Sequence, residues 1–223
     1  MRKNPLVENE YYHIYNRGVD KRDVFLDDRD YRRFLLAMDL LNDKQDGLMI
    51  RWRDYKENHP RESVQNFLAA GVRQRDPLVE IVAYCLNSNH YHFVLKQGDN
   101  DNGIKLFMQR LGNSYTKYFN EKYKRSGVLF QGRFKSSIIK SNNLLRMSVY
   151  VNCNSEIHDI HPARNYRWCS FVEYTDSSER GGQLCKKEVI LDQFKNKQDY
   201  FDYALENIKD LRQRKQDEKL WLE

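Results

Sequence analysis

Two apolar segments that follow each other almost without a break constrain the fold most. Residues 77–88 (PLVEIVAYCLNS) have the composition of a buried strand, and residues 89–97 (NHYHFVLKQ) continue in the same way. A connection this short joins antiparallel strands, because parallel strands need a crossover of a dozen or more residues. We therefore expect these segments to be neighbours in a mainly antiparallel sheet.

The other segments alternate between strand and helix patterns. Residues 10–18 (EYYHIYNRG) are typical of a strand, and residues 127–140 are typical of a hairpin that bends near Gly132. Apolar residues recur at helical spacing in three segments: 26–43, 104–125 and 141–156. The pattern predicts an α+β fold, with a central antiparallel sheet and helices packed on it.

The chain divides into one main domain and a tail. We expect a domain over residues 1–175, in which the polar segment 44–76 is an insertion with a possible short helix at VQNFLAA. Residues 176–223 are expected to form a C-terminal helical extension, with a short helix followed by a longer charged one. No apolar run approaches the ~18 residues of a membrane span, and the first residues lack the apolar stretch of a signal peptide. We expect a cytoplasmic protein that does not enter a membrane.

Positive charge is concentrated in the middle of the chain. The net charge is +6, and residues 121–150 contain seven Lys and Arg residues against one acid, Glu121. Residues 186–223 contain nine basic and nine acidic residues and are therefore neutral. This distribution favours a polyanionic partner for the middle segment. The four cysteines show no CxxC pairing, which gives a zinc cluster little support.

His90 and His92 are the most informative pair of polar residues. Side chains at i and i+2 of a strand point to one face, ~6.6 Å apart, so two imidazoles can converge on one divalent cation. The alternative is that both histidines simply occupy the polar face of a half-buried strand. Tyr150 and Asn154 have the i, i+4 spacing of one helical face, and Asn154 offers an amide oxygen as a third ligand. Two nitrogens and one oxygen suit Mg²⁺ or Mn²⁺.

Together these segments resemble the single-tyrosine transposases of the HUH endonuclease superfamily, and especially the REP-associated tyrosine transposases of the IS200-like family. Five blocks in the same order carry the resemblance: YHIYNRGVDKRDVF (12–25), AYCLNSNHYHFVL (83–95), residues 107–136, YVNCN (150–154) and YRWCSFVEY (166–174). The sequence departs from the family pattern in two places. Asn87-Ser88 stands where Met-Pro is common, and Ser155-Glu156 stands where Pro-Val is usual. Neither change affects His90, His92, Tyr150 or Asn154.

The resemblance implies a ferredoxin-like HUH endonuclease fold and a set of site residues. His90 and His92 would hold a divalent metal, Mg²⁺ or Mn²⁺, with Asn154 as the third ligand. Tyr150 would be the nucleophile in a metal-assisted transesterification on single-stranded DNA, at hairpin-forming repeats. The product would be a 5′-phosphotyrosine linkage and a free 3′-OH. Relatives act as monomers or as homodimers.

Several basic and aromatic residues are candidates for DNA contacts. We expect Arg125, Arg133 and Lys135 to bind backbone phosphates, and Arg17 and Arg110 to form a second contact surface. Three aromatic residues are candidates either for base stacking or for core packing: Tyr118, Phe130 and Phe134.

Two alternatives to Tyr150 and to the transposase reaction stay open. Tyr115 is the second candidate nucleophile, whereas Tyr91 should point away from the histidines into the core. Two other functions fit the same residues. One is an inactive protein that binds DNA hairpins, and the other is a metal-dependent phosphodiesterase that activates water.

Overall fold

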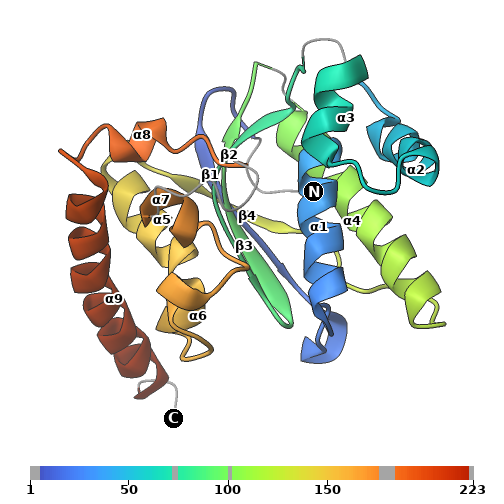
Figure 1. Ribbon diagram of the computed structural model, residues 1–223. Helices are drawn as coiled ribbons and strands as arrows, with labels where there is room; N and C mark the ends of the chain where they lie inside the picture. The colour runs from blue at the N-terminus through green and yellow to red at the C-terminus, as the bar shows by residue number, and fades with distance from the viewer. Residues whose placement is uncertain (1–5, 72–74, 100–101, 176–183, 221–223) are drawn as a thin grey trace.

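A four-stranded antiparallel sheet lies at the centre of the protein, in the order β2-β3-β1-β4 (Figure 1). Its strands are β1 (Tyr11–Arg17), β2 (Val79–Asn87), β3 (His90–Gln97) and β4 (Lys135–Ile139). The structure is a computed structural model. It describes residues 6–71, 75–99, 102–175 and 184–220.

The tight connection between β2 and β3 is confirmed. Only Ser88 and Asn89 lie between the two strands, and Asn87 pairs with His90 across the turn. The carbonyl oxygen of Ser88 accepts hydrogen bonds from the backbone nitrogens of Val24 and Phe25, at 2.7 and 3.0 Å. The turn is therefore held by residues that follow β1 as well as by its own strands.

Helices cover both faces of the sheet, which confirms the predicted α+β class. On one face lie α1 (Asp28–Leu40) and α4 (Gly103–Lys122), and on the other lie α5 (Leu144–Asn152) and α6 (Asn154–Ile157) (Figure 1). Alternate residues of each strand point to opposite faces, so each face contributes its own layer of core side chains.

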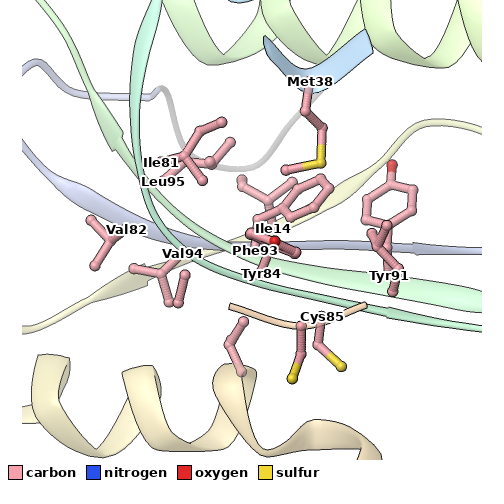
Figure 2. Close-up of a cluster of buried hydrophobic side chains, with 14 of the residues drawn as sticks. Ile14, Met38, Ile81, Val82, Tyr84, Cys85, Tyr91, Phe93, Val94 and Leu95 are labelled. Carbon is pink, nitrogen blue, oxygen red and sulfur yellow. The ribbon is translucent and has the colours of Figure 1, made fainter. Parts of the chain in front are cut away.

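The core shows this alternation directly. Tyr91 and Phe93 point toward the α1 side, where Met38 packs, whereas Val94 and Cys85 point toward the α5 side (Figure 2). All five residues are at most 3% exposed. The predicted position of Tyr91, on the face opposite the neighbouring histidines, is confirmed.

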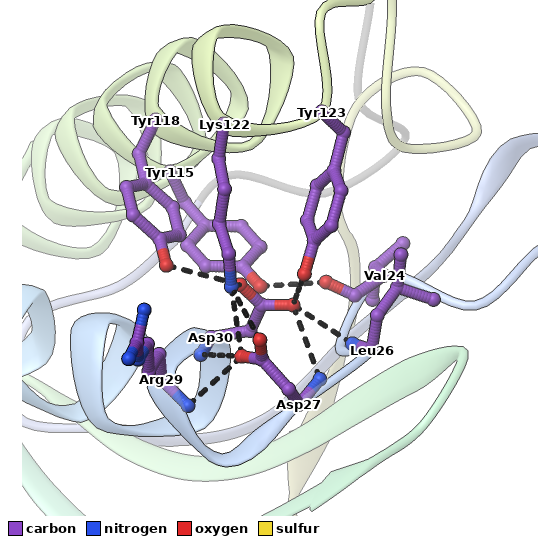
Figure 3. A network of polar contacts seen from close by, with 9 residues as sticks. All are labelled: Val24, Leu26, Asp27, Arg29, Asp30, Tyr115, Tyr118, Lys122 and Tyr123. Atoms are coloured by element: carbon purple, nitrogen blue, oxygen red, sulfur yellow. Dashed lines mark hydrogen bonds and ion pairs between the residues drawn. The ribbon is translucent and has the colours of Figure 1, made fainter.

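A buried carboxylate joins α1 to α4. Asp30 is fully buried and accepts hydrogen bonds from the hydroxyls of Tyr118 and Tyr123, at 3.0 and 2.8 Å (Figure 3). The ammonium group of Lys122 lies 2.7 Å from Asp30 and 2.8 Å from Asp27, the residue that caps α1. These contacts stabilise the face of the sheet that does not carry the histidines.

The prediction of a hairpin at residues 127–140 is wrong. Only β4 forms there, paired directly with β1, and Phe130 makes an isolated bridge to Gly18. Backbone hydrogen bonds hold residues 129–131 against the end of β1: Val19 N donates to Leu129 O at 3.0 Å, and Gln131 N donates to Arg17 O at 2.8 Å. The first half of the segment therefore wraps around the end of β1 instead of forming a second strand.

The segment predicted as an insertion contains two helices, α2 (Leu48–Asn58) and α3 (Val64–Gly71). The short helix expected at VQNFLAA is α3, whereas α2 was not predicted. Leu48 and Phe67 pack on Leu40 of α1 in a small cluster separate from the main core. This part of the chain is therefore attached at the end of α1.

The C-terminal segments pack against the α5 side of the molecule (Figure 1). They comprise α7 (Phe171–Thr175), α8 (Glu188–Leu191) and α9 (Lys197–Leu220), so the expected short helix followed by a long one is confirmed. Asn152 at the end of α5 donates a 2.8 Å hydrogen bond to the buried Tyr200 hydroxyl of α9. The described residues also form three short 3₁₀ helices: η1 (Val19–Lys21), η2 (Ser141–Asn143) and η3 (Ala163–Asn165). Among the described residues, no helix has the length and apolar character needed to cross a membrane.

Candidate active site

The two histidines of β3 share the face of the sheet that α5 and α6 cover. The ring centroids of His90 and His92 lie 5.1 Å apart, and the rings are nearly perpendicular. His92 is 8% exposed, so it lies beneath the surface, whereas His90 is only partly buried. Cross-strand pairing places Arg17 and Asn87 on either side of His90, and Tyr15 and Cys85 on either side of His92. Cross-strand partners point to the same face, so these two rows form the floor of the site.

Tyr150 and Asn154 both reach this floor, although not from one continuous helix. The helix expected over residues 141–156 is interrupted at Cys153, whose φ of −104° and ψ of 16° depart from helical values. Tyr150 lies in the last turn of α5, and Asn154 is the first residue of α6. The Tyr150 ring stands perpendicular to His92, with 5.7 Å between ring centroids. Asn154 is fully buried beside His90.

Asn87 connects two of the expected ligands. Its amide nitrogen donates hydrogen bonds to Nε2 of His90 at 2.9 Å and to Oδ1 of Asn154 at 2.7 Å. The amide nitrogen of Asn87, on β2, therefore brings together one acceptor from β3 and one from α6. The same buried amide of Asn154 has a nitrogen atom, Nδ2, without a hydrogen-bond partner.

Both expected ligand histidines are held in the neutral form. Burial lowers the pKa of His90 to about 4, with a further contribution from the charge of Arg17. Burial and the neighbouring histidines place the pKa of His92 well below its ordinary value. A neutral imidazole is the form that binds a metal ion, so neither residue has to lose a proton first at pH 7.

This donor set fits a divalent cation. His90 and His92 can supply imidazole nitrogens. Asn154 can supply an amide oxygen, which here accepts a hydrogen bond from the Asn87 amide that also contacts His90. Within the described residues, His, Cys, Asp and Glu side chains form no group of three or more that could hold a metal ion. The third expected ligand, Asn154, is an amide and therefore does not belong to these four residue types.

Two further histidines, which we did not predict from the sequence, lie next to the expected ligands. Nε2 of His13, on β1, lies 2.8 Å from Nδ1 of His92, and His158 lies beyond His90 with 6.0 Å between ring centroids. His13 and Tyr15 share the period-two spacing of His90 and His92, which was the available signal. The register of β1 against β3 could not be read from the sequence, and this register places His13 next to His92.

The expected DNA-binding residues occupy three different environments. Arg17, Arg133 and Lys135 are exposed, and Lys135 pairs with Tyr15 in the row that contains His92. Arg125 is partly buried and donates to the Asn120 side chain and to the Val128 carbonyl, at 2.7 and 2.9 Å. The Arg110 side chain is only 16% exposed and binds the carbonyl of Asp43 at 2.6 Å, on α4 and on the far side of the sheet. The structure therefore brings Arg17 and Lys135 to the floor of the site, and not Arg110.

The competing aromatic residues lie elsewhere. Tyr115, the second candidate nucleophile, is fully buried under the opposite face of the sheet and donates a 2.6 Å hydrogen bond to the carbonyl of Val24. Tyr118 binds Asp30, and Phe130 is 8% exposed against Tyr91. For Tyr118 and Phe130, packing within the protein is the observed role. Phe134 is partly buried against the core.

Comparison with known protein families finds a match over part of this chain. The family model described as "Transposase IS200 like" matches residues 52–154, a little less than half of the chain, and this segment includes His90, His92, Tyr150 and Asn154. The match confirms the resemblance to the IS200-like transposases over that segment. His13 lies outside it. No curated protein matches this chain.

Two solved structures illustrate what the chain is similar to. A REP-associated tyrosine transposase bound to a REP hairpin has 14% sequence identity and a TM-score of 0.49, over 78% of this chain and 83% of that one. A bacterial tRNA(His) guanylyltransferase-like protein in complex with GTP has 10% identity and a TM-score of 0.38, over 69% of this chain and 68% of that one.

Proposed function

We propose that this protein is a metal-dependent, single-stranded DNA endonuclease and strand transferase that uses Tyr150 as its nucleophile. The observation that carries the proposal is the placement of Tyr150. Its ring lies against His92, while Asn154, from the following turn, lies beside His90. Nucleophile and metal-ligand candidates from two distant parts of the chain thus meet on one face of the sheet.

The residues that would hold the cation are His90, His92 and Asn154, with Mg²⁺ or Mn²⁺ as the expected metal. When bound, such a cation polarises a phosphate oxygen and neutralises charge that develops on the phosphoryl group. The burial of His92 and Asn154 limits the access of water to that side of the site. Exclusion of water strengthens the electrostatic interactions made within the site.

The reaction we propose is a transesterification in two balanced steps. The Tyr150 oxygen attacks the scissile phosphorus and loses its proton, while the bond from phosphorus to the 3′ oxygen breaks and that oxygen takes up a proton. The products are a 5′-phosphotyrosine linkage and a free 3′-OH. A 3′-OH, either the original one or that of another strand, then attacks the phosphotyrosine and releases Tyr150. One phosphodiester replaces another, so the exchange needs no nucleotide cofactor.

The substrate we propose is single-stranded DNA next to a hairpin, as the resemblance implies. Arg17 and Lys135 are exposed in the two rows that contain His90 and His92, and the exposed Arg133 lies close to β4. Cations in these positions can bind the phosphates on either side of the scissile bond. Arg110 is already bound to Asp43 and Asp46, so we assign it to the support of α4.

We propose that residues 1–175 form the endonuclease domain, with 44–76 as an insertion, and that residues 176–223 form a helical extension; within this extension, residues 176–183 and 221–223 lie outside the described residues. We propose that one chain supplies every residue of the site, because the ring centroids of Tyr150 and His92 lie 5.7 Å apart within it. The hydrogen bond from Asn152, at the end of α5, to Tyr200 of α9 supports a role for the extension next to the helix that carries Tyr150. We therefore propose that α9 supports α5 from the side opposite the sheet.

A covalent trapping experiment tests this function. The protein is incubated with Mn²⁺ and with labelled single-stranded DNA that carries a hairpin, and then denatured. We expect a labelled protein–DNA adduct that survives denaturation and is absent in Tyr150→Phe. Tyr115→Phe is the matched control and should keep the adduct if it folds, because Tyr115 lies on the opposite face of the sheet.

Other outcomes would contradict the proposal. Cleavage of the DNA without an adduct would indicate a phosphodiesterase that activates water. Binding of the hairpin without cleavage, in Mg²⁺ as well as in Mn²⁺, would indicate an inactive DNA-binding protein. An adduct that persists in Tyr150→Phe would identify another nucleophile.

A further inference from the structure

Two buried imidazoles, His13 and His92, are joined directly to each other. Nε2 of His13 lies 2.8 Å from Nδ1 of His92, and the ring planes differ by only 8°. The ring centroids are 5.1 Å apart. Because the nitrogen atoms are closer than stacked rings can approach, the rings lie edge to edge in nearly one plane, and the hydrogen bond lies in that plane. Both residues are 8% exposed.

This hydrogen bond decides which nitrogen of His92 is available to a metal ion. A neutral imidazole carries one proton, on Nδ1 or on Nε2, and the nitrogen without it is the acceptor. The contact with His13 occupies Nδ1 of His92, which leaves Nε2 for a ligand. If the Nδ1–H of His92 donates this hydrogen bond to Nε2 of His13, then Nε2 of His92 has a free lone pair.

The same two rings also contact the proposed nucleophile. The centroid of Tyr150 lies 5.7 Å from that of His13 and 5.7 Å from that of His92, and each pair of planes meets at 89°. Tyr15 lies nearly parallel to both imidazoles, 4.9 Å from His13 and 5.8 Å from His92. The hydrogen-bonded pair therefore forms a flat wall that Tyr150 meets at a right angle.

We propose that His13 is a positioning residue. Its Nε2 accepts a hydrogen bond from the Nδ1–H of His92, fixes His92 as the tautomer with a free Nε2, and orients the shared plane against which Tyr150 rests. This inference rests on the proposed function, because it assigns Nε2 of His92 to the metal. A hydrogen-bond partner that fixes the tautomer of a ligating histidine is typically worth ten- to a hundred-fold in metal affinity.

Two substitutions separate hydrogen bonding from packing. His13→Gln can place an amide oxygen near the position of Nε2, so it can keep the acceptor. His13→Phe keeps a flat ring against Tyr150 but has no acceptor. Thermal unfolding with a chelator present shows whether each variant is folded. Two readouts then follow: the protonated nitrogen of His92, from long-range ¹H–¹⁵N correlation spectra of the metal-free protein, and the Mn²⁺ affinity, from calorimetry.

We expect His92 to carry its proton on Nδ1 in the wild-type protein and in His13→Gln, and their Mn²⁺ affinities to be similar. In His13→Phe, we expect the Nε2-protonated form to appear and Mn²⁺ binding to weaken about 10- to 100-fold. A wild-type His92 protonated on Nε2 would overturn the proposal, and so would unchanged affinity and tautomer in His13→Phe. If the wild-type protein forms no adduct with DNA, the proposed function fails, whereas the tautomer still decides the role of His13.

Discussion

Asn87 offers the sharpest test of the proposed metal site. Its amide nitrogen donates to Nε2 of His90 and to Oδ1 of Asn154, so a cation bound at the proposed site would compete with the Asn87 amide for the same two acceptors. We predict that Asn87→Leu destabilises the metal-free protein and tightens the binding of Mn²⁺. Leucine is close in size to asparagine, so the change removes the donor without leaving a large cavity.

The size of the effect follows from the two hydrogen bonds. Without the amide, the fully buried Oδ1 of Asn154 loses its donor, which costs about 1–3 kcal/mol in the metal-free state, and the partly buried Nε2 of His90 adds less. Once a cation is bound, both acceptors have a positive partner with or without Asn87, so the bound states differ much less. Because the substitution destabilises mainly the metal-free state, it should tighten Mn²⁺ binding by about 5- to 150-fold.

Calorimetric titration with Mn²⁺ and thermal unfolding with and without chelator measure both halves of this prediction. Asn42→Leu is the matched control. Asn42 is also a buried asparagine with two hydrogen bonds, to Val79 at the other end of β2. It should lower stability and leave the Mn²⁺ affinity unchanged. Weaker Mn²⁺ binding by Asn87→Leu would refute the reasoning, because it would mean that Asn87 is itself a ligand or is needed to hold Asn154.

Two further predictions concern pH and the opposite face of the sheet. Burial lowers the pKa of His13 and of His90 to about 4, against about 6.5 when unfolded. With chelator present, the free energy of unfolding should be highest above about pH 6.5 and should fall as the pH drops toward 4, because the unfolded chain binds protons at a higher pH than the folded one. The free energies of unfolding from denaturant titrations at pH 7 and pH 5 should differ by about 2 kcal/mol per histidine. Replacing Asp30 by Asn leaves Lys122 and two tyrosine hydroxyls without a buried carboxylate, and should cost about 3–5 kcal/mol in urea unfolding. The exposed Asp27→Asn should cost much less, and equal losses would contradict this account of α1 and α4.

The sequence contained enough information to identify the central strands and the face of the histidines. The short connection between residues 77–88 and 89–97 fixed an antiparallel pair, and the period of two placed His90 and His92 on one face and Tyr91 on the other. Both inferences depend only on local geometry, and both are confirmed.

What the sequence could not show depends on contacts between distant segments. His13 joins the site through the register of β1 against β3, and Asn87 through the approach of α6, and neither is a local property. The hairpin expected at 127–140 failed because its first half is held by the end of β1. Arg110 has the charge expected of a DNA contact, but its guanidinium group already donates to the carbonyl of Asp43, in the segment after α1.

The two-residue turn between β2 and β3 has a consequence for how this chain tolerates change in length. Side chains alternate along a strand, so a shift of one residue would exchange the two faces of β3. His90 and His92 would then enter the layer under α1 and α4, and Tyr91 and Phe93 would replace them opposite α5. We therefore expect substitutions at residues 88–89 to be tolerated, whereas one inserted or deleted residue would put Tyr91 and Phe93 where the histidines of the proposed site now lie.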